Sequence, residues 1–124
     1  MSLESRDWHQ VQELAKSAQR DGALALTDEV RDLLRRVARE VAVSDGEAEQ
    51  ALRSSASAMD LAIEVSRRIR EGSRRLSRAI VDANRLHASG NLLGARRLLE
   101  ELLAQEVVPL YREIARNEWD ELGL

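Results

Sequence analysis

Arginine side chains crowd the middle of the chain, where residues 67–78 read RRIREGSRRLSR. Arginine is well suited to bind carboxylates and phosphates, because its planar fork of N–H donors matches their oxygens. If this segment is helical, four arginines spaced three or four residues apart share a solvent-facing stripe: Arg67, Arg70, Arg74 and Arg78. We call these four residues the arginine stripe. They are the candidate partner-binding residues on this helix.

The arginine stripe also has acidic neighbours. Glu64 lies three and four residues before Arg67 and Arg68, and Glu71 is followed by two arginines at the same spacing. Such ion pairs on an exposed helix stabilise it by about 0.2–0.5 kcal/mol each. The stripe is therefore either an anion-binding surface or a solvated helix face neutralised by its own acids. The net charge of −3 and the lack of aromatic residues between the arginines argue against nucleic-acid binding.

Residues for catalysis or metal binding are scarce. The chain has no cysteine, and its two histidines, His9 and His87, lie far apart in sequence. No serine has the setting of a nucleophile elbow, and no glycine-rich loop could hold a phosphate. We therefore expect a protein that is not an enzyme and that binds no cofactor or metal.

Two tryptophans, Trp8 and Trp119, lie near opposite ends of the chain. Tryptophan often anchors protein interfaces. In a chain without phenylalanine, the tryptophans are also the largest side chains available to fill a core. Trp119 is a candidate partner contact if it stays exposed.

The composition indicates one helical domain over residues 1–124. The chain is 44% apolar and 33% charged, and only 2% of its residues are aromatic. Alanine, leucine, arginine and glutamate dominate, and all favour helix. Because no apolar run could span a bilayer and the N-terminus lacks a secretory signal, we expect no membrane association and a cytoplasmic location.

Apolar residues recur at helical spacing along the whole chain. Helices are predicted over residues 3–20, 27–41, 44–52 and 56–88, and a fifth follows the turn at residues 89–91. That short turn makes the last two an antiparallel hairpin, which is expected to bring Glu106 and Glu113 near the arginine-rich segment 67–78. The predicted fold is all-α: a compact helical bundle of about five helices, in which the first three cover this long hairpin.

Two residues interrupt the helical pattern. Gly72 lies within the apolar seam of the helix over 56–88, and it costs about 1 kcal/mol relative to alanine there. It is expected to admit a close helix crossing or to mark a kink. Pro109 cannot donate a backbone hydrogen bond, so it either kinks the last helix or begins a new one.

Six segments carry a resemblance to a known family: DWHQV (7–11), LALTDEV (24–30), VSDGEA (43–48), SRRIREGS (66–73), GNLLGAR (90–96) and VVPLYRE (107–113). On these segments the chain resembles the DUSAM domain family, a set of small paralogous proteins of myxobacteria. The resemblance implies a small bacterial, cytoplasmic, helical protein of unknown function and supplies no site residues.

The function predicted from these observations is a non-catalytic protein–protein interaction or regulatory module, whose protein partner and pathway are unknown. One alternative is a binder of an anionic partner, either nucleic acid or an acidic surface, through the arginine stripe. Another is an immunity or antagonist protein for a cognate partner. The wide apolar arc of the helix after residue 91 adds the hypothesis of a homodimer.

Overall fold

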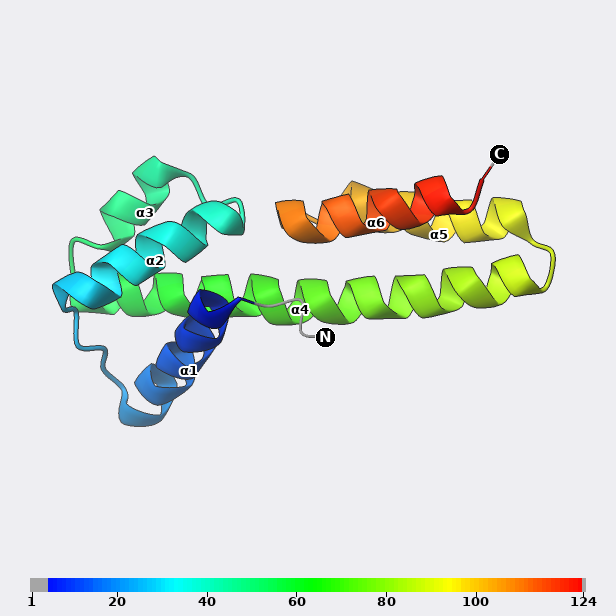
Figure 1. Ribbon diagram of the computed structural model, residues 1–124. Helices are drawn as coiled ribbons and strands as arrows, with labels where there is room; N and C mark the ends of the chain where they lie inside the picture. Colours follow the sequence, from blue (N-terminus) through cyan, green and yellow to red (C-terminus); the bar gives the residue numbers. More distant parts are fainter. Residues whose placement is uncertain (1–4, 124) are drawn as a thin grey trace. The chain divides into compact units, whose positions relative to one another are not determined.

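The computed structural model describes residues 5–123, which form six α-helices joined by short connections (Figure 1). The helices are α1 (Arg6–Asp21), α2 (Asp28–Glu40), α3 (Asp45–Ala51), α4 (Ser55–Ala88), α5 (Leu92–Gln105) and α6 (Pro109–Glu121). The all-α prediction is confirmed over the described residues, which contain no strand. The prediction of about five helices is corrected to six.

The sixth helix exists because Pro109 begins a helix of its own. Val108 is extended, with φ −74° and ψ 116°, as expected for a residue that precedes proline. Proline is well tolerated at the start of a helix, where its missing N–H would have no partner. Of the two predicted outcomes, a kink and a new helix, the structure has the new helix.

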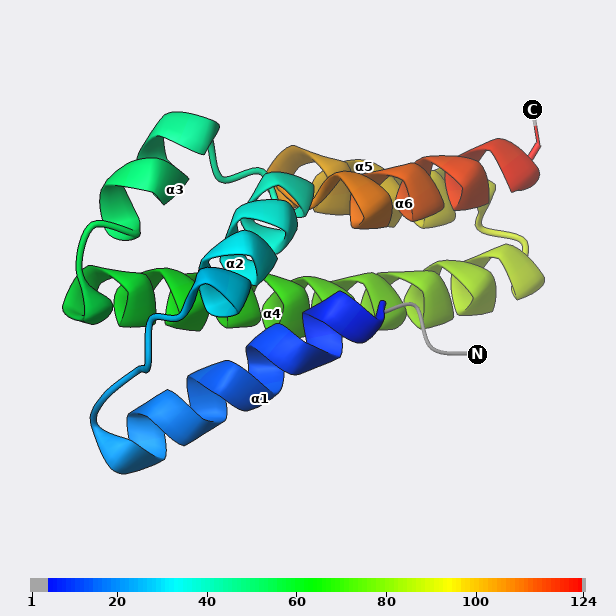
Figure 2. The same cartoon turned by 60° about the vertical axis from the view of Figure 1, so that its left-hand side comes forward.

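The predicted hairpin is formed by α4 and α5, which run antiparallel in both views (Figures 1 and 2). Gly90 adopts a left-handed φ of 88°, and the Asn91 N–H donates to the Leu86 carbonyl at 2.8 Å, which closes α4. The Asn91 side chain then accepts from the Gly94 N–H at 2.8 Å and caps α5.

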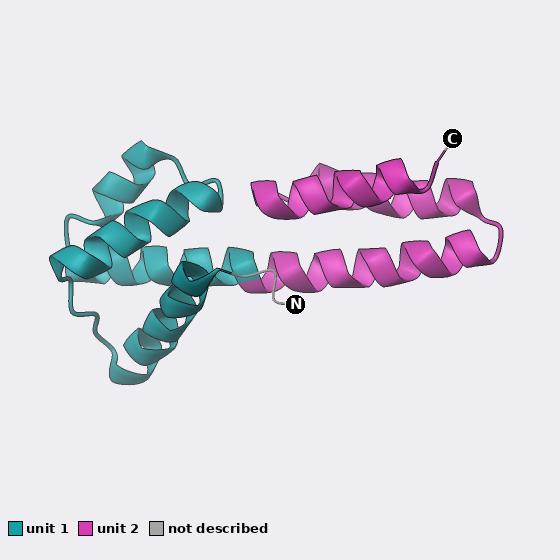
Figure 3. Cartoon of the chain, viewed as in Figure 1, with its two compact units in different colours: residues 1–69 teal, residues 70–124 magenta. Residues whose placement is uncertain are grey.

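The chain divides into two compact units (Figure 3). Unit 1 spans Met1–Ile69 and unit 2 spans Arg70–Leu124. The helices therefore group differently from the prediction: α1–α3 share a unit with the N-terminal part of α4, whereas α5 and α6 share one with its C-terminal part. That residues 1–124 form one domain stays a prediction.

Unit 1 is built from helices whose starts the sequence marks clearly. Thr27 and Ser44 cap α2 and α3: the Ser44 hydroxyl accepts from the Glu47 N–H at 3.2 Å, as in a capping box, and also donates to the Glu47 carboxylate at 2.8 Å. Ser5 caps α1; the predicted start of that helix at Leu3 lies outside the described residues. Valine, leucine and alanine side chains fill the core together with Trp8, which is 3% exposed.

Side chains also tie the helices of unit 1 together. The Trp8 indole N–H donates to the Glu40 carboxylate at 3.1 Å, and the Arg36 guanidinium pairs with Asp7 at 3.1 Å, so both contacts join α1 to α2.

No helix within residues 5–123 has the length and apolar character needed to cross a bilayer.

Candidate functional site

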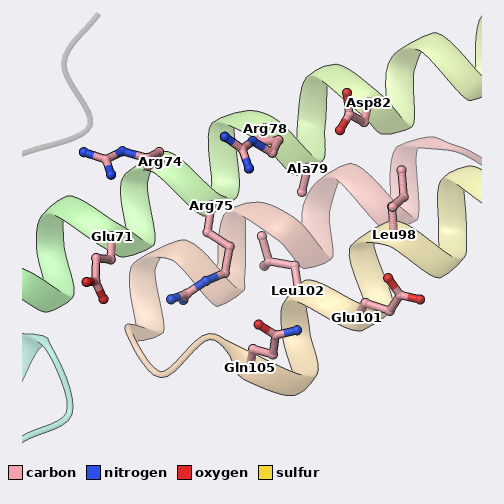
Figure 4. Close-up of a pocket in the computed structure, with 10 residues that line it drawn as sticks. All are labelled: Glu71, Arg74, Arg75, Arg78, Ala79, Asp82, Leu98, Glu101, Leu102 and Gln105. Carbon is pink, nitrogen blue, oxygen red and sulfur yellow. The ribbon is translucent and has the colours of Figure 1, made fainter.

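The candidate site is an open groove of ≈ 370 Å³ between α4 and α5 in unit 2 (Figure 4). We call it the α4–α5 groove. The side chains that α4 contributes are Glu71, Arg74, Arg75, Arg78, Ala79 and Asp82. Those that α5 contributes are Leu98, Glu101, Leu102 and Gln105.

The buried faces of the two helices determine which side chains line the groove. Leu76 and Ala83 of α4 and Leu99 of α5 are at most 2% exposed and belong to the core of unit 2. On a helix with 3.6 residues per turn, burying these positions turns Arg74 and Arg78 outward. The apolar pattern of α4 thus positions the charged groups of the groove.

The centre of the groove is apolar and its edges are charged. Leu102 is buried, whereas Leu98 and Ala79 are partly exposed to the groove. Arg74 and Arg78 project from α4, and Glu101 projects from α5 (Figure 4). A ligand that combines charged and apolar groups would fit this arrangement.

Arg75 has a structural role at one end of the groove. Its guanidinium donates to the buried carboxylate of Glu106 at 2.8 Å. The other oxygen of Glu106 accepts from the backbone N–H groups of Val107 and Val108, at 3.1 and 3.0 Å. The predicted proximity of Glu106 to the arginine-rich segment is confirmed, and the carboxylate supports the extended backbone that precedes α6.

Gly72 lies beside this ion pair, where α4 passes close to α6. A Cβ atom at Gly72 would lie 2.7 Å from Cδ2 and 2.8 Å from Cε2 of Tyr111, and 3.0 Å from the Glu106 carboxylate. Tyr111 is fully buried, so its ring has little room to move. The prediction that Gly72 admits a close helix crossing is confirmed.

Arg74 and Arg78 differ from Arg75 because neither forms an ion pair or hydrogen bond with another described residue. Asp82 of the groove lies 3.8 Å from Arg85, one turn further along α4. Two guanidinium groups with unused donors therefore lie at the α4 edge of the groove. Chemically, they can bind carboxylate or phosphate oxygens of a ligand.

The structure does not gather the whole arginine stripe in this groove. Only Arg74 and Arg78 line it. Arg70 is an exposed residue of unit 2 outside the groove lining. Arg67 belongs to unit 1, where its guanidinium donates to Glu64 at 2.9 and 2.7 Å. Arg67 is thus paired with an acid of its own helix, whereas Arg74 and Arg78 have no such partner among the described residues. That the arginine stripe binds a partner stays a prediction.

Glu64 accepts from a second arginine as well. The Arg68 guanidinium donates to Glu64 at 2.7 Å and to the Val41 carbonyl at the end of α2 at 2.9 Å. Hydrogen bonds from Arg67, and then from Arg68, hold the pKa of Glu64 below its usual range, although partial burial opposes them. These arginines therefore stabilise unit 1.

Trp119 is partly buried in the structure. It packs against a cluster of Ala83, Ala95 and Leu99, and its indole N–H donates to Glu100 at 3.3 Å. The Arg96 guanidinium lies 5.1 Å above its ring. The side chain is thus engaged within unit 2, and its role as a partner contact stays a prediction.

No cluster of three or more histidine, cysteine or acidic side chains lies close enough to hold a metal within residues 5–123. His9 and His87 are both exposed. The lining of the α4–α5 groove contains no hydroxyl, thiol or imidazole group. The described groove residues therefore offer guanidinium, carboxylate, amide and apolar groups.

Sequence reasoning missed the part of the groove that α5 contributes. A signal for it was present, because Leu98, Glu101, Leu102 and Gln105 follow the i, i+3, i+4, i+7 spacing of a single helix face. Which face of α4 this stripe meets depends on how the two helices pack, and spacing alone does not determine that.

The chain matches no curated protein and no solved structure. It does match one family model over residues 6–122, a range that includes all six described helices. The chain therefore belongs to the family described as protein of unknown function (DUF2379).

Proposed function

We propose that this protein is a non-catalytic protein–protein interaction or regulatory module and that unit 2 carries its binding surface. One observation supports this most directly. Arg74 and Arg78 present unused hydrogen-bond donors beside the partly exposed apolar side chains of Ala79 and Leu98. Protein interfaces combine apolar surface with arginine more often than the rest of a protein surface does.

The chemistry of the groove favours binding over catalysis. General acid–base catalysis needs a titratable group held in reach of a reacting atom, and covalent catalysis needs an activated nucleophile. The groove offers arginines, which stay protonated, and carboxylates that are open to solvent. We infer that the protein is not an enzyme.

Affinity purification of the full chain from its native cells tests this function. The tagged chain would be compared with the same tag alone, and bound proteins quantified by mass spectrometry. The proposal expects a partner that is enriched at a defined stoichiometry and that binds the purified chain directly. A chain that retains no protein and converts a metabolite in a cell extract would contradict it.

The more specific sequence predictions remain proposals. These are membership of the DUSAM group, a cytoplasmic location, an immunity or antagonist role and a homodimer. The homodimer was suggested by the wide apolar arc of α5, but Ala95, Leu99 and Leu102 of that arc are buried within unit 2. Leu93 is 76% exposed and is the apolar side chain of α5 that a second copy would have to cover.

A further inference from the structure

We propose that the α4–α5 groove binds an acidic helical segment of a partner protein. In this complex, two carboxylates of the segment pair with Arg74 and Arg78, and neighbouring apolar side chains cover Ala79 and Leu98. The inference rests on the proposed function, because it specifies the partner of the same interaction module.

The charges at the α4 edge of the groove favour an acidic ligand there, although Glu71, Asp82 and Glu101 also line the groove. Arg75 is neutralised by Glu106 at 2.8 Å, and Asp82 lies 3.8 Å from Arg85. Arg74 and Arg78 have no such partner among the described residues, so two positive charges remain at the α4 edge. A bound carboxylate would supply the charge-assisted hydrogen bonds that these guanidinium groups lack.

The spacing of the two arginines favours a helical ligand. Arg74 and Arg78 are four residues apart on α4, which places their Cβ atoms about 5–6 Å apart. Two acidic residues spaced by three or four on another helix have the same separation. A leucine stripe beside those acids would lie over the apolar part of the groove, as in other complexes in which a helix occupies a groove.

The acids around the groove argue against nucleic acid as the ligand. Glu71, Asp82 and Glu101 line the groove together with the arginines. A phosphate backbone carries negative charge all along its length, so these carboxylates would repel it on both sides of Arg74 and Arg78. A peptide can place acids opposite the arginines and neutral or basic residues opposite the carboxylates.

The test uses a designed helical peptide and the full chain. The acidic peptide carries two glutamates four residues apart beside two leucines four residues apart. Two matched peptides replace the glutamates by glutamine or by lysine. Fluorescence anisotropy of the labelled peptides measures binding to the wild-type chain and to two double variants.

The first variant, Arg74→Glu with Arg78→Glu, reverses the two groove charges. The second, Arg97→Glu with Arg116→Glu, changes the net charge equally at two exposed arginines outside the groove lining. All four side chains are exposed, so both variants should remain folded, which circular dichroism would verify.

We expect the first variant to bind the acidic peptide about tenfold more weakly or worse, since attraction is replaced by repulsion at two contacts. The second should stay within about twofold of wild type at moderate salt, where distant exposed charges are screened. The lysine peptide should bind the first variant more tightly than it binds wild type. This exchange of charges is a readout that loss of folding cannot produce.

Several results would overturn the inference. They are equal binding of the glutamate and glutamine peptides, equal weakening by the two variants, or no saturable binding by wild type up to about 1 mM. The groove would be assigned to nucleic acid if duplex DNA bound the wild-type chain more tightly than the peptide does and no longer bound the first variant. The groove would be assigned to a second copy of the chain if the wild-type chain were a dimer and the first variant a monomer.

The affinity purification separates this inference from the proposed function. A direct partner that binds the first variant as strongly as wild type would leave the interaction function standing and would remove the groove as its site. A partner lost with the first variant but kept by the second would support both.

Discussion

Replacing Gly72 by alanine tests whether this residue is required for packing. In an open helix this change stabilises the protein by about 1 kcal/mol, because alanine has the higher helix propensity. At Gly72, however, the added methyl group would meet the Tyr111 ring at 2.7 and 2.8 Å and Glu106 at 3.0 Å. We therefore expect Gly72→Ala to destabilise the protein, opposite to what helix propensity alone predicts.

The magnitude follows from the two opposing effects. Overpacking a well-packed core costs about 1–3 kcal/mol. The upper part of that range applies, since the Tyr111 ring is fully buried and the Glu106 carboxylate is held by Arg75 and two backbone N–H groups. After the gain in helix propensity, a net loss of about 1–2 kcal/mol in the free energy of unfolding remains.

Urea unfolding followed by circular dichroism measures this loss. Gly46→Ala is the matched control, because Gly46 is also helical and a Cβ there would meet nothing within 4 Å. The control should be as stable as wild type or more stable. If Gly72→Ala proves as stable as the control, the close crossing of α4 and α6 is not what requires glycine.

Three further predictions concern stability. Ala42 has a left-handed φ of 67°, so Ala42→Gly should raise the free energy of unfolding by about 1 kcal/mol. The same substitution within a helix, Ala104→Gly in α5, should lower the free energy of unfolding by a similar amount. Urea titrations measure both changes, and a shift of both variants in the same direction would contradict this prediction. Glu106→Ala leaves the buried Val108 N–H and an arginine without their acceptor, so it should cost about 2–4 kcal/mol in thermal or urea unfolding, and Glu106→Gln less. The pKa of Glu64 is lowered by its two arginines from a reference of 4.5, so its contribution to stability is fully present above about pH 4.5 and is lost as the pH falls below that value. Glu64→Gln should therefore flatten the acid side of the stability–pH profile, and an unchanged profile would contradict the assigned ion pairs.

Much of the fold could be predicted because its signals are local. The caps at Thr27 and Ser44 and the turn at Gly90 each act within about four residues, so the sequence around them is sufficient to place helix ends. The consequence of Pro109 is not local. A kink and a new helix are both compatible with proline at this position. The buried Glu106 carboxylate accepts from the backbone N–H groups of Val107 and Val108 and so stabilises the extended backbone before Pro109.

The candidate site was predicted only in part, for a related reason. Helical spacing correctly turned Arg74 and Arg78 away from the core. Helical spacing could not show that Arg75, the residue after Arg74, pairs with Glu106, which lies just beyond the end of α5. The contribution of Leu98 and Leu102 depends on the register between α4 and α5, and register is a property of packing rather than of spacing.

The arginines of α4 resemble one another in sequence but have different surroundings, and this difference determines where binding is expected. Arg68 joins α4 to the end of α2 and Arg75 supports the start of α6, so replacing either would change stability as well as any binding. Arg74 and Arg78 have no such structural contact with any residue of the described range 5–123. A variant of these two residues can therefore separate binding from folding, whereas a variant that removed all the arginines of the segment would confuse the two.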